Sequence, residues 1–145
     1  MTARDTDRDI ADVLVRYATA VDTRDWALFR TCFTAECQAD YGEIGSWPGV
    51  DELAGFMQQI HDQCGRSLHR ITNIVVTGHG DLAAARSYVD AVVMFPDNQA
   101  GTRAIGYYDD HLVPTPDGWK IAQRRYTMIH LAQLEATLGG LSPST

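Results

Sequence analysis

The stretch LHRITNIVVTGHGDLAAARSYVDAVVMF, residues 68 to 95, decides the fold. On both sides of GHGD its side chains follow a period of two, which is typical of β-strands with one buried face. GHGD itself carries two glycines, and glycine accepts the positive φ that tight turns demand. The stretch therefore predicts a long β-hairpin.

Two more long strands follow this hairpin. TRAIGYYDDHLV, residues 102 to 113, and WKIAQRRYTMIH, residues 119 to 130, show the same period and flank the turn sequence PTPDG. Upstream, CQADYGEI at 37 to 44 is short and alternating, and GSWPG at 45 to 49 is dense in turn residues. We predict a short strand and a loop there.

Helical periodicity dominates the first part of the chain. It predicts an amphipathic helix from about Asp5 to Asp22 and a third helix from about Val50 to Cys64. Between them, Asp25 is placed to cap a short second helix, in which Trp26, Phe29 and Phe33 follow the helical period. Near the C-terminus Leu131, Leu134 and Leu138 have helical spacing and could form a lid or a subunit contact.

Segregated helices and strands indicate an α+β fold. We expect one domain, residues 1–145, with three main helices and a cone-shaped barrel. Its strongly curved, mainly antiparallel sheet would wrap around the N-terminal helix and leave an open mouth. A chain of 145 residues is long enough to bury a core, alone or as a homo-oligomer such as a dimer or trimer.

The amino-acid composition limits which binding partners the chain can have. The net charge of -7 repels phosphate backbones, so we expect no nucleic acid. No apolar run approaches the roughly 20 residues that span a bilayer, and the start lacks a signal-peptide pattern, which favours the cytoplasm and no membrane contact. Cys32, Cys37 and Cys64 form no C-x-x-C motif, so neither a disulfide framework nor a zinc knuckle is indicated.

Asp22 and His69 are the first candidate pair. Asp22 ends the first helix at the negative end of the helix dipole, which disfavours a carboxylate unless a partner such as a histidine compensates. The alternative is an ordinary exposed aspartate. His69 shares its strand face with Ile71, Asn73 and Val75, which are apolar apart from the asparagine and favour an inward imidazole. His61 and His79 are expected to be solvated. A metal site at His61, Cys64 and His69 matches no zinc spacing.

Strand alternation supplies further candidates. In the first strand the apolar residues 37, 39 and 41 share a face, which places Tyr41 in the pocket and Asp40 outside. Tyr41 could contribute its hydroxyl there, or equally its ring as part of an aromatic wall. In the last strand the alternation favours Arg124 over Arg125 as the inward arginine, which needs a carboxylate or a developing anion as partner. Asp109 and Asp110 lie on opposite faces and are taken as structural or interfacial.

The chain resembles the SnoaL-like branch of the nuclear-transport-factor-2-like superfamily. YATAVDTRDW at 17–26, the hairpin just described and GYYDDHLVPTPDGWKIAQRRY at 106–126 carry this resemblance, which extends from Ile10 to about His130. Members such as scytalone dehydratase, bile acid 7α-dehydratase and hexachlorocyclohexane dehydrochlorinase share an Asp–His pair in the cone. Asp22 and His69 occupy the matching positions.

The resemblance implies an acid-base lyase without metal or organic cofactor, acting on a cyclic, largely apolar small molecule such as a steroid-like or polyketide-like alcohol. His69 would be the base and Asp22 would orient it, while Tyr17, Tyr41 and Arg124 would act on oxygen or developing negative charge. We expect the substrate to contact Trp47, Phe56, Tyr126 and Met128. The alternatives are an isomerase or polyketide cyclase in the same pocket, with Asp40 as base, or a non-catalytic binding or assembly module.

Overall fold

The computed structural model describes residues 2–78 and 80–136. Helices come first along the chain and long strands follow, as the periodicity predicts. The elements are α1 (Ala3–Thr23), α2 (Trp26–Thr31), β1 (Phe33–Asp40), the 3₁₀ turn η1 (Gly42–Ile44), β2 (Ser46–Pro48), α3 (Val50–Asp62), β3 (Ser67–Thr77), β4 (Ala83–Met94), β5 (Gly101–Thr115) and β6 (Gly118–Leu134).

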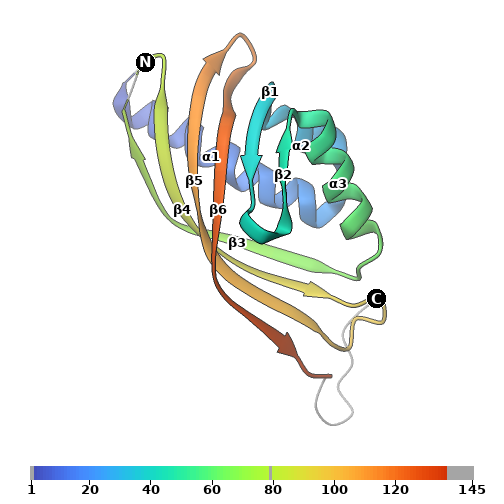
Figure 1. Ribbon diagram of the computed structural model, residues 1–145. Coiled ribbons are helices and arrows are strands. Elements are labelled where there is room, and N and C mark those ends of the chain that lie inside the picture. Colours follow the sequence, from blue (N-terminus) through green and yellow to red (C-terminus); the bar gives the residue numbers. More distant parts are fainter. Residues whose placement is uncertain (1, 79, 137–145) are drawn as a thin grey trace.

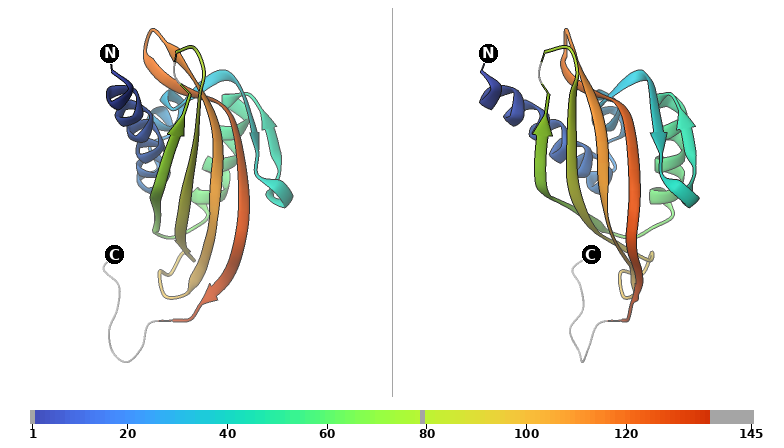
Figure 2. Two further views of the ribbon diagram at one scale, coloured as in Figure 1. Left: turned by 90° about the vertical axis from the view of Figure 1, so that its left-hand side faces the viewer. Right: turned by 60° about the vertical axis from the view of Figure 1, so that its left-hand side comes forward.

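The strands form a single six-stranded sheet in the order β2-β1-β6-β5-β4-β3. All neighbours are antiparallel except β1 and β6, which are parallel. The sheet curls strongly, and α1 crosses its concave side (Figure 1). Views from other directions show the same helix inside the curve, with α2 and α3 beside β1 and β2 (Figure 2). The predicted α+β cone is therefore confirmed.

Helix α1 follows from its sequence. Thr2 accepts a hydrogen bond from the backbone N–H of Asp5, and the Asp5 side chain bonds back to Thr2, which satisfies two donors that a helix start leaves free. Its apolar stripe is buried against the sheet, with Ile10, Leu14 and Tyr17 at most 2% exposed. This packing carries the C-terminal end of α1, and with it Asp22, to the start of β3.

Three local predictions were wrong. The segment GSWPG was expected to be a loop, but it contains β2, because β1 offers a free edge on which Trp47 pairs with Ala39. The first strand begins at Phe33, which was expected in the second helix, and ends at Asp40. Leu131 and Leu134 belong to β6, since β5 extends alongside as far as Leu134, and Leu138 lies outside the described residues.

No helix within residues 2–78 and 80–136 is both long and apolar enough to cross a membrane.

The cap of α2 gives a first test. The Asp25 carboxylate accepts the backbone N–H of Leu28 at 3.0 Å. Asp25→Ala should lower the free energy of unfolding by about 0.5–2 kcal/mol, because the helix start loses its side-chain acceptor. Chemical denaturation measures this change. Asp12→Ala, an exposed change in the middle of α1, is the control, and equal losses in both variants would contradict the capping role.

Candidate active site

Asp22 and His69 meet at the junction of α1 and β3. The His69 ring nitrogen Nδ1 lies 2.7 Å from Asp22 Oδ1, and the His69 backbone N–H donates to Asp22 Oδ2 at 2.7 Å. Only 10% of the His69 side chain and 13% of the Asp22 side chain are exposed. Because a carboxylate can only accept, Nδ1 carries the proton. In the neutral imidazole, Nε2 of His69 then has the lone pair, which is the tautomer that a general base requires.

Two residues not foreseen from the sequence hold Asp22 in place. Ser67 Oγ donates to Asp22 Oδ1 at 2.9 Å and accepts from Arg24 Nη1 at 2.8 Å. The direction of these bonds is fixed, since a guanidinium only donates. Arg24 follows α1 in the left-handed conformation, with φ of 58°, and also donates to the Val21 carbonyl. The one sequence feature that could have pointed to Ser67 is the alternation of side chains along the strand, because Ser67 shares a strand face with His69.

The Ser67 hydroxyl can be tested directly. Ser67→Ala should lower the free energy of unfolding by about 1.5–3 kcal/mol, the usual contribution of a hydrogen bond to a charged group. It should also move the His69 Nδ1 proton resonance in NMR spectra, because Asp22 then has one donor fewer. Ser46→Ala is a matched control, since the exposed Ser46 Oγ lies 3.4 Å from Asp40 Oδ1. An unchanged resonance in Ser67→Ala would contradict the role of Ser67.

His61 was expected to be solvated, and that prediction was wrong. It is 8% exposed, and its ring lies 6.0 Å from the His69 ring, centroid to centroid. Its Nδ1 is 2.8 Å from the Met57 carbonyl oxygen. Burial lowers the pKa of His61. A second, neutral imidazole thus faces the pair, beside a cavity of about 380 Å³ that Asp22 and His61 both line.

A second polar centre lies deeper in the cone. The hydroxyls of Tyr17 on α1 and Tyr41 after β1 are 3.0 Å apart, and both residues are at most 5% exposed. Burial raises the pKa of each hydroxyl well above its ordinary value. Both therefore keep their protons at neutral pH and can donate hydrogen bonds. An α-helix rises about 1.5 Å per residue, so Tyr17 and Asp22 are only about 7.5 Å apart along the axis.

Arg124 points inward, as the alternation predicts, while 74% of the Arg125 side chain is exposed. Asp110, its register partner on β5, accepts from Arg124 Nε at 2.8 Å and from Nη2 at 3.0 Å. Burial acts to lower the pKa of Arg124, but the Asp110 carboxylate and the nearby tyrosines hold it above its ordinary value. The guanidinium is thus already neutralised by Asp110, which was expected from the sequence to be structural or interfacial.

The expected substrate contacts fall into two groups. Trp47 on β2 stacks on Phe56 of α3 with ring centroids 4.2 Å apart, and the Tyr41 ring lies 5.9 Å from Trp47. On β6, Tyr126 lies 5.8 Å from the Tyr41 ring, and Met128 is 38% exposed. Tyr41, Tyr126 and Met128 share a groove of about 570 Å³. Asp40 faces outward and its side chain is 50% exposed.

The family follows from comparison with known proteins. A family model described as a SnoaL-like domain matches residues 3–125. The chain belongs to the SnoaL-like domain family. It is also 30% identical over 118 residues to the uncharacterized protein Rv2910c of Mycobacterium tuberculosis, covering 80% of each chain.

Solved structures share the fold of this SnoaL-like protein. A proposed aromatic ring hydroxylase of Novosphingobium aromaticivorans has a TM-score of 0.81 at 26% identity, covering 92% of this chain and 96% of its own. A proposed scytalone dehydratase of the same organism has a TM-score of 0.80 at 19% identity, covering 96% of this chain and 99% of its own. A hexachlorocyclohexane dehydrochlorinase, LinA type 2, has a TM-score of 0.78 at 16% identity, covering 97% of both chains.

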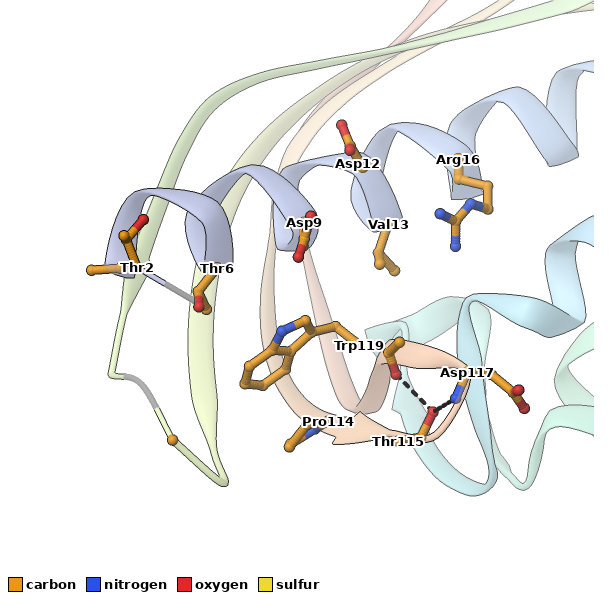
Figure 3. Close-up of a pocket in the computed structure, with 13 residues that line it drawn as sticks. Thr2, Thr6, Asp9, Asp12, Val13, Arg16, Pro114, Thr115, Asp117 and Trp119 are labelled. Carbon is orange, nitrogen blue, oxygen red and sulfur yellow. Dashed lines mark hydrogen bonds between the residues drawn. The ribbon is translucent and has the colours of Figure 1, made fainter.

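Another cavity of the SnoaL-like cone lies away from these residues. It has a volume of about 620 Å³ and is lined by the N-terminal half of α1 and the β5–β6 turn, including Asp9, Thr115 and Trp119 (Figure 3). None of the predicted site residues lines it. Asp22, His61 and His69 meet at the other end of α1, where the candidate active site is placed.

Proposed function

We propose that this SnoaL-like protein is a cofactor-independent acid-base lyase that eliminates water, or a comparable leaving group, from a cyclic, largely apolar small molecule. One observation carries the proposal: the 2.7 Å contact between Asp22 and the Nδ1 of His69, which leaves Nε2 of His69 as a base. The fold shared with a proposed scytalone dehydratase and with LinA supports the same reaction class.

The proposal gives each of these residues a role. His69 Nε2 removes a proton from a carbon next to a carbonyl, and the Asp22 carboxylate stabilises the imidazolium that forms. The hydroxyls of Tyr17 and Tyr41 act as a pair: one donates to the other, and the remaining hydrogen is donated to the carbonyl oxygen, where negative charge develops, or to the departing hydroxyl. Apolar walls at Trp47 and Phe56 suit a ring with few polar groups. The bond to the leaving group breaks as the new double bond forms.

The rivals in other classes have less support. An isomerase with a strand aspartate as base would need Asp40 inside, but Asp40 faces solvent near Arg125. A non-catalytic binding module would have no need for a carboxylate that fixes the histidine tautomer. The pair therefore supports acid-base chemistry over binding alone, and the outward Asp40 counts against an isomerase that uses it as base.

A screen tests the proposal. Purified protein is incubated with cyclic β-hydroxy ketones, including hydroxylated tetralone and decalone compounds, and with halogenated cyclohexanes, and products are followed by mass spectrometry. We expect loss of water or hydrogen halide from at least one ring compound, absent with His69→Ala. Products of unchanged mass formed only by the wild type would favour the isomerase. No conversion combined with tight ligand binding, unaffected by His69→Ala, would favour the binding module.

A further inference from the structure

Asp110 and Arg124 form a buried ion pair. The proposed reaction gives this pair no direct role. Their side chains are 0% and 1% exposed. Removing two charges from water is expensive, and replacing such a pair by apolar residues of similar volume is often neutral or stabilising. Stability alone is therefore a weak reason for an ion pair at this position.

The surroundings of the guanidinium fix its plane. The central carbon of Arg124 lies 4.2 Å from the centroid of the Tyr17 ring and 3.8 Å from that of the Tyr108 ring. Two of its nitrogens are bound to the Asp110 carboxylate. Stacking and the bidentate contact together leave little freedom for the remaining nitrogen, Nη1.

That remaining nitrogen is directed at the tyrosine pair. Arg124 Nη1 lies 3.5 Å from the Tyr41 hydroxyl oxygen. Because a guanidinium can only donate, the Tyr41 oxygen accepts from it, and the hydrogen of Tyr41 must point elsewhere. Tyr17, at 3.0 Å, can donate to the second lone pair of Tyr41. In that direction the hydrogen of Tyr41, which lines the groove of about 570 Å³, is available to an acceptor atom of a bound molecule; in the reverse direction Tyr41 donates to Tyr17.

We propose that Asp110 is a positioning residue, which holds Arg124 so that the Tyr41 hydroxyl acts as a hydrogen-bond donor to an oxygen of the substrate. Asp110 itself does not touch the substrate. Its effect passes through Arg124 to Tyr41 and Tyr17. The proposal rests on the proposed lyase function, which supplies the substrate oxygen, whereas the effect of Asp110 on Arg124 and the tyrosines exists in the free protein.

The first test needs no substrate. Tyrosinate absorbance is titrated in wild type, Asp110→Asn, and the double variant Asp110→Leu with Arg124→Met. Asp110→Asn leaves the charge of Arg124 unbalanced beside the buried tyrosines, so we expect one more tyrosine to ionise at a lower pH than in wild type. The double variant, which has no cation there, should not show this. Circular dichroism at each pH verifies that the protein is folded.

Asp109→Asn is the matched control. Asp109 is the neighbouring residue on the opposite face, where it pairs with Arg86 at 2.7 Å, so its tyrosine titration should equal that of wild type. An Asp110→Asn protein that is folded and titrates like wild type would overturn the proposal. Should Asp110→Asn not fold, Asp110→Glu is titrated in its place, because it keeps the charge but shifts the guanidinium, and a tyrosine titration equal to that of wild type in this variant would overturn the proposal equally.

The kinetic test uses the compound identified by the screen. Asp110→Asn should lower kcat by about 10-fold or more with KM nearly unchanged, a smaller loss than the ~10²–10³-fold typical when an oxyanion donor itself is removed. Loss confined to KM would overturn the positioning role. If the screen finds no substrate, the tyrosine titration still decides the proposal, so the two failures are distinguishable.

Discussion

Replacing His69 by alanine should lower kcat on the compound identified by the screen by about 10²–10⁴-fold, the usual contribution of a positioned general base. The reason is that Nε2 of His69, held by the 2.7 Å contact of Nδ1 with Asp22, supplies the lone pair that removes the proton. Steady-state kinetics with the wild type and the variant measure this loss. Asp22→Asn should also reduce kcat, because the amide can favour the wrong tautomer.

The control for this prediction is another histidine of the sheet. His111 lies on the exposed face of β5, with its Nδ1 3.0 Å from Gln123 Oε1. His111→Ala should leave kcat unchanged. Circular dichroism and thermal melting separate a chemical effect from unfolding. A folded His69→Ala protein that retains turnover would remove the basis of the proposed mechanism.

Arg124→Met should lower the free energy of unfolding by about 3–5 kcal/mol, because it leaves the Asp110 carboxylate buried without its counter-charge. The Asp110 side chain is 0% exposed, so water cannot replace the lost partner. Urea denaturation gives the size of the change. Replacing both partners, with Asp110→Leu and Arg124→Met, should recover most of the loss, since no unpaired charge is then buried.

Arg125→Met is the matched control for this comparison. Arg125 is adjacent in sequence but 74% exposed, and its Nε lies 3.9 Å from Asp40 Oδ2. An exposed pair of this kind contributes about 0–1 kcal/mol. Similar small losses in Arg124→Met and Arg125→Met would contradict the buried ion pair.

Periodicity was enough to predict the architecture. The alternating stretch at 68–95 predicted the β3–β4 hairpin, and the stripe of Ile10, Leu14 and Tyr17 predicted the helix that the sheet encloses. The strand at the edge of the sheet was harder to predict. β2 forms from turn residues only because β1 leaves a free edge beside it, and such pairing is a property of the tertiary structure.

The site was partly predictable for similar reasons. Alternation placed Tyr41 and Arg124 inside, because a strand with one buried face fixes the direction of each side chain. It could not pair Asp110 with Arg124, since the β5–β6 register shifts between His111 and Leu112, which separate the pair from the turn. Arg24 reaches Ser67 from a left-handed residue after α1, and no periodicity describes that position.

The tautomer of His69 tests the central claim most directly. ¹⁵N NMR of the imidazole at alkaline pH, where a free histidine is neutral, reports which ring nitrogen carries the proton. We predict a protonated Nδ1 and an unprotonated Nε2 in wild type, and a mixture of tautomers in Asp22→Asn. A proton on Nε2 in the wild-type protein would contradict the account, because His69 would then have no lone pair to offer a substrate.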